Sequence, residues 1–362
     1  MQNDSLQLEY ESDILEDNIL SISDTLLARL LKDNTTTPEN AGDDFSKWNN
    51  IIWATEDYAS KGEGFGFSDQ ITKEKITGEN GMVIRPRALK SKYEQTARAK
   101  NMAEIFTPAW VCNAQINLCD NSWFGRENVF NTENYDTNSW TTNHNKIEFP
   151  EDKTWQDYLY DRRLEITCGE APYIVSRYDA VTGDIYPVEN RIGMLDRKLR
   201  IVSENTNGET EWRQWARIAV QSVYGYEWQG DSLLLAREAV LYSYKDHFEY
   251  NFKRKMNFAD KNDLEEFETI AEIVSWNLFQ MDGLKFVIPN SCHDVVSQEK
   301  TTTMGSLFDD QKVVTEKKIT PCPGCKEKNP LKHNGIYVKI RNWFDEDETV
   351  LTMVSMLNNN EE

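Results

Sequence analysis

The stretch that decides the fold is Leu164-Glu165-Ile166-Thr167-Cys168-Gly169-Glu170-Ala171-Pro172. Its first three residues predict a short strand, and the small residues that follow predict a turn in which the backbone comes close to another group. In α/β proteins, loop glycines of this kind admit a ligand at the carboxyl end of a parallel strand. The segment therefore predicts a sheet with a ligand site at its carboxyl edge.

The chain after this turn alternates between helix and strand patterns. Apolar residues at helical spacing predict helices over 212–223, 233–247 and 264–278. Short strands are expected at 226–228 and 279–282, each directly after a helix. This alternation predicts an α/β fold with a doubly wound, mostly parallel, Rossmann-like sheet, an N-terminal appendage and a small C-terminal Cys-x-x-Cys knuckle.

Shifts in composition divide the chain into four parts. In the first, Leu26, Leu27, Leu30 and Leu31 predict a short apolar helix. In the third, turn signals bracket a run over 197–202 that alternates basic and apolar residues. The parts are an acidic extension (1–45), a cap with a basic segment (46–102), a cofactor domain (103–290) with an insertion at 178–207, and a C-terminal segment (291–362).

The chain is strongly acidic. Its 362 residues include 40 Lys and Arg against 61 Asp and Glu, a net charge of −21. Such a chain repels a polyanion on average, which excludes a histone-like DNA coat and confines nucleic-acid contacts to a local basic patch. The chain has one dense basic segment, which consists of Arg85, Arg87, Lys90, Lys92, Arg98 and Lys100. The pattern fits an arm that contacts phosphates and a solvated helix face equally well.

The sequence favours a cytoplasmic location. It contains no apolar run of the length that a membrane span needs, and its first sixteen residues are acidic where a signal peptide would be basic and then apolar. Six cysteines in a chain of this size without a secretory signal are weak evidence for disulfides. We therefore expect reduced thiols and no membrane partner.

Three acidic residues are expected at the ends of successive strands. Glu165 closes the first predicted strand, Glu227 the second and Asp282 the third. A carboxylate at each of these places is costly unless it is paired or solvated. Their convergence on one crevice would therefore indicate a ligand site.

In their order, these segments resemble the S-adenosylmethionine-dependent, adenine-specific DNA methyltransferases that serve as modification subunits of restriction systems. The resemblance covers residues 102–290 and starts with a Thr107-Pro108 pair before an apolar helix. Its glycine-rich loop is similar to the family's acid-x-x-Cys/Ser-Gly-x-Gly, and Asp282-Gly283-Leu284 is similar to the family's later acidic site. By local physics alone, Thr107-Pro108 is also simply the start of a helix.

The resemblance implies a role for each matching residue. Thr107 and Pro108 would lie at the edge of the methionine pocket of S-adenosylmethionine. The methionine pocket would be lined by Glu165, Cys168, Gly169 and Ala171. Glu227 would bind the ribose, Trp228 would cover the adenine, and Asp282 would bind the adenine amine.

The chain departs from the family in three ways. Ala171 replaces the second loop glycine, and 58 residues separate Gly169 from Glu227, where the family has about twenty. The family's Asn/Asp-Pro-Pro-Tyr/Phe motif, which polarises the flipped adenine, has no counterpart after Asp282. The catalytic residues therefore stay unassigned.

A second chemical signal is Pro321-Cys322-Pro323-Gly324-Cys325. Two thiolates at this spacing can take two corners of a tetrahedral zinc site. His333 together with Cys292 or His293 would complete a Cys3His or Cys2His2 set. A redox pair and a plain turn with free thiols remain alternatives.

From the sequence we expect an S-adenosylmethionine-binding DNA adenine (N6) methyltransferase-like subunit of a restriction-modification or phage-defence system. Its partners would be DNA and a restriction or specificity subunit, and a structural zinc is a second expected ligand. The alternative is a catalytically inactive methyltransferase-fold subunit that acts as a scaffold with a partner. A zinc-dependent adaptor without a cofactor is a third hypothesis, and it depends on Cys322 and Cys325 alone.

Overall fold

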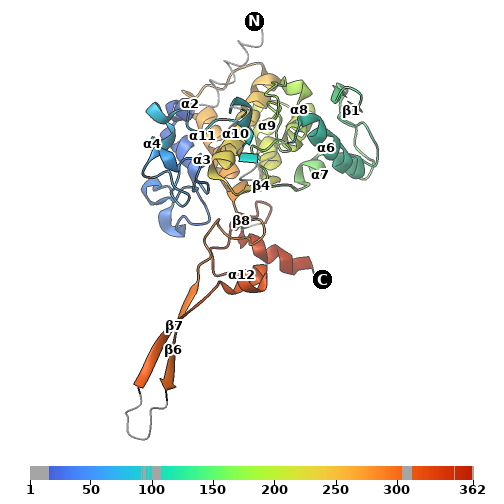
Figure 1. The fold of residues 1–362 in the computed structure, drawn as a ribbon. Helices are drawn as coiled ribbons and strands as arrows, with labels where there is room; N and C mark the ends of the chain where they lie inside the picture. Colours follow the sequence, from blue (N-terminus) through green and yellow to red (C-terminus); the bar gives the residue numbers. More distant parts are fainter. Residues whose placement is uncertain are drawn as a thin grey trace.

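The computed structural model shows a helical body on a small sheet, with a C-terminal part on the other side of that sheet (Figure 1). It describes residues 16–90, 92, 95, 96, 98, 99, 107–303, 312–345 and 347–360. Lys100, one of the predicted basic residues, lies outside this range.

The sheet consists of three parallel strands. They are β3 (Arg163–Ile166), β4 (Val223–Glu227) and β5 (Leu278–Gln280), in the order β3-β4-β5. In register, Ile166 lies opposite Tyr226, and Tyr226 lies opposite Phe279. The predicted parallel sheet is confirmed, although β4 begins three residues earlier than expected.

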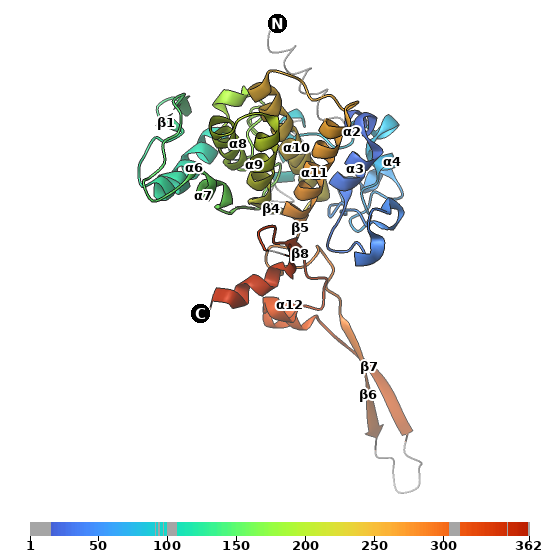
Figure 2. The ribbon, with the colours of Figure 1, turned by 180° about the vertical axis from the view of Figure 1, so that it is seen from behind.

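Two pairs of helices connect the strands. They are α8 (Met194–Asn205) and α9 (Glu209–Gln221) before β4, and α10 (Gly230–Phe252) and α11 (Lys261–Asn277) before β5. All four lie on the same side of β4 and β5 in both views (Figures 1 and 2). Right-handed crossovers between strands in unreversed order give this one-sided arrangement. A doubly wound sheet requires a reversal of strand order, and the described strands show none, so they do not form the doubly wound arrangement that we expected.

The N-terminal residues belong to the same hydrophobic core as this helical layer. The predicted apolar helix is α3 (Asp24–Leu31), whose four leucines are buried. It packs against α10 and α11, while Ile52 hydrogen-bonds through both its N–H and its carbonyl group to the Gln280 side chain. The other elements before β3 are α2 (Glu16–Ile22), η1 (Glu39–Ala41), η2 (Phe45–Lys47), η3 (Ala59–Lys61), α4 (Lys73–Ile76), η4 (Gly78–Asn80), η5 (Arg87–Leu89), α6 (Ala109–Phe124), β1 (Asn131–Asn134), β2 (Ser139–Thr142) and α7 (Trp155–Tyr160).

The C-terminal part covers the other face of the sheet. Tyr226, Phe279 and Ile340 share a second buried cluster there, and the Tyr224 hydroxyl donates to the carbonyl of Arg341. A long hairpin, which we did not predict, extends away from the body (Figures 1 and 2). The remaining elements are η6 (Val188–Asn190), β6 (Val295–Thr303), β7 (Lys312–Thr320), α12 (Pro323–Glu327), η7 (Pro330–Lys332), β8 (Lys339–Arg341), β9 (Val350–Thr352) and η8 (Met353–Asn360).

The alternating run over 197–202 is helical and lies within α8. Two of its three basic residues, Arg197 and Lys198, are buried, and Arg200 is half-buried. Arg197 pairs with Asp120 at 2.6 Å, and the Lys198 ammonium donates to the carbonyl of Leu159 at 3.0 Å and to the hydroxyl of Ser222 at 2.7 Å. Because these partners lie far away in the sequence, the alternation of basic and apolar residues did not indicate a helix with charged side chains in the core.

Two buried carboxyl groups meet where α2 joins the body. Glu16 and Glu238 are each 1% exposed, and no other residue in the described part of the chain hydrogen-bonds to the four oxygens of their side chains. Burial raises the pKa of Glu16 to about 8, and burial and the neighbouring Glu16 raise the pKa of Glu238. A proton is therefore held more tightly in the folded chain than in the unfolded chain.

This pair makes stability depend on pH. Between the ordinary glutamate pKa and about 8, the unfolded chain loses protons that the folded chain keeps, so the free energy of unfolding falls as the pH rises. We expect Glu238→Gln to raise the free energy of unfolding at pH 8 by about 1 to 3 kcal/mol and to flatten this slope. Urea unfolding at pH 5 and pH 8 measures both effects. The exposed Glu265→Gln should change neither, and a loss of stability in Glu238→Gln at pH 8 would contradict the assignment.

Candidate cofactor edge and metal centre

The glycine loop and the end of β4 are joined through a buried carboxylate. The Gly169 N–H donates to Oε2 of Glu227 at 2.9 Å, and the N–H groups of Trp228 and Gln229 donate to Oε1 at 2.8 and 3.2 Å. Burial raises the pKa of Glu227, while these three N–H groups act in the opposite direction. These bonds take three of the about four acceptor sites of the carboxylate, so Oε2 can also accept a hydroxyl group of a ligand.

The other predicted acid of this loop, Glu165, supports the backbone. Its two oxygens accept the N–H groups of Tyr173 at 3.2 Å and Ile174 at 3.1 Å. Burial raises its pKa well above the ordinary value, and these N–H bonds oppose that shift. The Tyr173 side chain also hydrogen-bonds with Thr107, so the start of α6 lies against the loop. Pro108 occupies the cap position directly before α6.

Cys168 and Ala171 have structural roles. Cys168 is 1% exposed, and its side chain lies against Gly225 of β4, where an added Cβ would come within 2.9 Å of the Cys168 Cβ. Burial raises the pKa of its thiol well above the ordinary value, so it is no thiolate nucleophile. Ala171 is fully buried with a φ of +63°, in the left-handed region where the resembled family has glycine.

The N-terminal segment reaches the carboxyl ends of β4 and β5. The Gly230 N–H donates to the carbonyl of Trp53 at 3.1 Å, and the Trp228 indole donates to the carbonyl of Ala54 at 3.0 Å. At Gly230 an added Cβ would lie 2.1 Å from the carbonyl oxygen of Ile52, so only glycine fits. The indole of Trp228 is therefore fixed by residues that the sequence had placed in a separate cap.

Asp282 lies next to this edge. Its Oδ1 accepts the N–H groups of Leu284 and Lys285, and its Oδ2 pairs with the Lys285 ammonium at 3.0 Å. The carbonyl of Glu227 accepts the N–H of Met281 at 2.9 Å, and Glu227 lies opposite Gln280, so Asp282 lies two residues beyond the paired ends of β4 and β5. The structure thus brings Thr107, Gly169, Glu227 and Asp282 to one end of the sheet, each held by contacts within the chain.

The basic segment is not a free cationic arm throughout its length. Arg98 is 6% exposed and pairs with Asp231 at 2.9 Å and with Asp57 at 3.0 Å. Lys90 is also buried, with its ammonium 3.7 Å from the same Asp231 carboxylate. Burial alone would raise the pKa of Asp231, but the two cations lower it. Lys90 and Arg98 therefore form ion pairs within the fold, and a phosphate-binding role for them stays a prediction.

The other described members of this segment lie closer to solvent. Lys92 is exposed, and Arg85 and Arg87 are half-buried. The backbone N–H of Arg87 donates to the Glu170 carboxylate at 2.7 Å, so this part of the segment lies beside the glycine loop. A phosphate-binding role for Arg85, Arg87 and Lys92 stays a prediction.

Three cysteines and a histidine gather at the base of the hairpin. The Nδ1 of His333 lies 3.4 Å from the Sγ of Cys292 and 3.6 Å from those of Cys322 and Cys325. All four ligand atoms lie within 4.8 Å of one another. With Zn–S near 2.3 Å and Zn–N near 2.0 Å, a tetrahedral site has an S···N edge of about 3.5 Å. This Cys3His group could hold a metal ion such as zinc, with Cys292 rather than His293 as its fourth ligand.

The surroundings of the group suit thiolates. The backbone N–H of Asn334 donates to the Cys322 sulfur at 3.3 Å, and at Gly324 an added Cβ would lie 2.5 Å from the backbone nitrogen of His333. Burial alone would raise the pKa of Cys322, but the N–H groups of Asn334 and Cys325 and the His333 ring lower it to about 6. The sequence did not identify Asn334 as part of this group. The one feature that could have indicated it is its position directly after His333, a predicted ligand.

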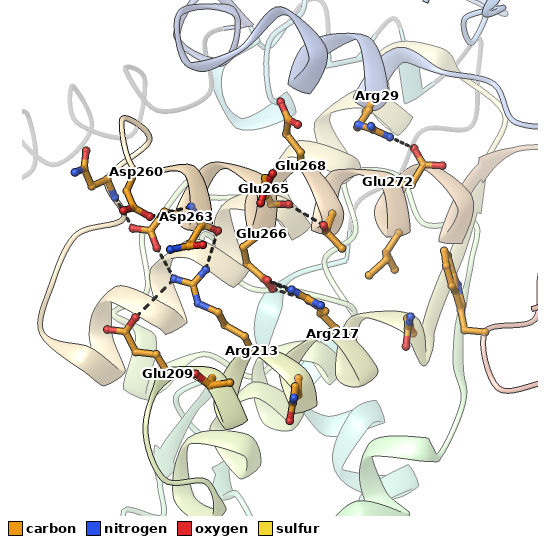
Figure 3. A pocket seen from close by; sticks show the side chains of 18 of the residues that line it. Arg29, Glu209, Arg213, Arg217, Asp260, Asp263, Glu265, Glu266, Glu268 and Glu272 are labelled. Carbon is orange, nitrogen blue, oxygen red and sulfur yellow. Dashed lines mark hydrogen bonds and ion pairs between the residues drawn. The ribbon is translucent and has the colours of Figure 1, made fainter. Parts of the chain in front are cut away.

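A large cavity lies elsewhere, between α9 and α11 (Figure 3). It has a volume of about 1270 Å³ and is lined by eight carboxylates and four arginines. All four arginines are ion-paired: Arg29 with Glu272, Arg213 with Asp263, Arg217 with Glu266, and Arg254 with Glu209. This cavity is a salt-bridged helix interface, and its excess of carboxylates disfavours a polyanion.

Comparisons with protein-family models, with curated proteins and with solved structures found no match to this chain. Among the described residues, no helix has the length and apolar character that a membrane crossing requires.

Two substitutions separate buried from exposed members of the basic segment. We expect Arg98→Ala to lower the free energy of unfolding by about 3 to 5 kcal/mol, because it leaves the buried Asp231 charge without its closest partner. Lys92→Ala should change stability by less than about 0.5 kcal/mol, because Lys92 is exposed. Urea unfolding monitored by circular dichroism measures both. Equal effects of the two substitutions would overturn the assignment of Arg98 to the core.

Proposed function

We propose that the chain is an S-adenosylmethionine-binding, DNA adenine methyltransferase-like subunit of a restriction-modification or phage-defence system. The observation that carries the proposal is the meeting of the glycine loop with two acids at the carboxyl ends of neighbouring parallel strands. Gly169 and Glu227 are in direct contact, and Asp282 follows the next strand in register. This is the edge at which open α/β sheets bind nucleotides.

The acceptors at this edge suit the nucleoside half of the cofactor. Glu227 would accept a ribose hydroxyl group through Oε2, and Asp282 would accept the adenine amine. Both side chains are held by backbone N–H groups, so they would be oriented before the ligand arrives. Thr107 and Gly169 would lie beside the methionine end. When bound, S-adenosylmethionine would supply an activated methyl group.

Calorimetry with S-adenosylmethionine tests this proposal. We expect a dissociation constant of the order of micromolar for the parent chain, and about 10- to 100-fold weaker binding for Glu227→Gln and for Asp282→Asn, since each loses a hydrogen bond to a charged acceptor. Glu265→Gln, an exposed change on α11, should bind like the parent. Circular dichroism must show that all variants are folded. A folded parent chain that binds no cofactor would overturn the proposal.

A second candidate function is a non-catalytic or incomplete subunit that depends on a partner. The absence of an Asn-Pro-Pro-Tyr type motif favours it, and so does the position of β3. The strand that carries the glycine loop is paired with β4 on one edge, and no other described strand pairs with it. Leu164 and Ile166 on this strand are 40% and 67% exposed.

In a doubly wound sheet, the ligand crevice lies where strands flank the first strand on both sides. Here the described strands supply one side only. The unpaired backbone N–H and C=O groups of an open strand edge are a template for pairing with another chain, and exposed apolar side chains beside them favour such a contact. The second candidate therefore assigns the missing strand, and the residues that polarise the adenine, to a partner protein.

Transfer of a labelled methyl group distinguishes the two candidates. If the chain is catalytic, it should label the N6 position of adenine in unmodified DNA, and Glu227→Gln should reduce the labelling about 10-fold or more at limiting cofactor. If the chain acts with a partner, it should bind the cofactor without labelling DNA, and Ile166→Lys should leave cofactor binding unchanged. Reproducible labelling by the purified chain would remove the second candidate.

A further inference from the structure

The hairpin of β6 and β7 forms an arm. Its strands pair in an unbroken antiparallel register from Val295 opposite Thr320 to Thr303 opposite Lys312. Nine residues per strand correspond to a length of about 30 Å. Both views show the arm standing clear of the body along its length (Figures 1 and 2). Its direction is therefore set by its base.

Both strands of the arm meet the Cys3His group at this base. Cys292 precedes the first residue of β6 by three positions, and Cys322 follows the last residue of β7 by two. The two sulfurs lie within 4.8 Å of each other. The same group of ligands thus holds the two ends of the arm together.

The other two ligands connect the arm to the body. Cys325 is part of α12, and His333 follows η7 directly. Beyond His333 the chain returns to the sheet: Tyr337 bridges to Val287, and the N–H of Ile288 donates to the carbonyl of Ile336 at 2.8 Å. Asn334 adds a reciprocal amide contact, since its side chain donates to and accepts from the backbone of His293 at 2.7 and 3.2 Å.

We propose that Zn²⁺ bound by Cys292, Cys322, Cys325 and His333 is a structural clamp that fixes the direction of the arm relative to the sheet. Three sulfurs and an imidazole nitrogen are the donors of structural zinc sites. Four protein ligands leave no open coordination position, so the site has no place for a metal-bound reactant. This inference does not depend on the proposed function of the sheet edge.

Two measurements on the full-length chain test the clamp. Elemental analysis of the purified protein should give one zinc per chain. Hydrogen exchange followed by mass spectrometry should show that EDTA, or Cys322→Ser, speeds exchange at least 10-fold in residues 287–295 and 320–337. Exchange in α10, which lies in the core of the body, should be unchanged. Co²⁺ in place of zinc should give the visible absorption of a tetrahedral thiolate site.

The control variant is Cys119→Ser, which removes an exposed thiol of α6 outside the group. It should keep one zinc and the parent exchange pattern. If the chain is purified without zinc and also fails to take up Co²⁺, the proposal that this group binds a metal is contradicted. If Cys322→Ser loses zinc but hydrogen exchange at the base of the arm is not faster, the proposed structural clamp is contradicted. Faster exchange in α10 as well would overturn it too, because the metal would then support the whole fold.

Discussion

The buried carboxylate of Glu227 is the constraint on which the rest of the site depends. It accepts N–H groups from the glycine loop and from the two residues that lead into α10. A buried charge is tolerated only when hydrogen bonds satisfy it, so the loop, the end of β4 and the start of α10 hold one another in place. Gly230 then admits the carbonyl of Ile52, which joins the N-terminal segment to the same edge. Residues 16–90 and the candidate cofactor edge are therefore parts of one structure.

Much of the layout could be predicted from the sequence, because apolar periodicity and turn residues are local. The helices α3, α9, α10 and α11 and the strand β3 lie where these patterns placed them. The predicted start of β4 is three residues late because the apolar pattern extends the preceding helix to residue 223, where the strand begins. In the structure α9 ends at Gln221, and Gly225 lies within the strand, where the Cys168 side chain fills the space that a Cβ would need. Strand order is not a local property, and the alternation of helices and strands gave no information on it.

The sequence could not show which charges are buried, because their partners are distant. Arg98 is 133 residues from Asp231, and Arg197 is 77 residues from Asp120. In contrast, the Cys322 and Cys325 pair carried its own signal, and the structure joins both to His333. The choice of Cys292 over His293 depended on geometry: neighbouring residues of an extended segment point to opposite sides. His293 instead contacts Asn334 through its backbone.

Burial of cations also changes how the net charge of −21 should be understood. Arg237 is 1% exposed and donates to backbone carbonyls of Leu30 and Leu278, and Lys198 likewise donates to backbone carbonyls. Desolvation lowers the pKa of Arg237 to about 10, so it stays protonated near neutral pH. The described part of the chain also buries thirteen acids against six cations, so its surface carries a smaller net negative charge than the composition suggests.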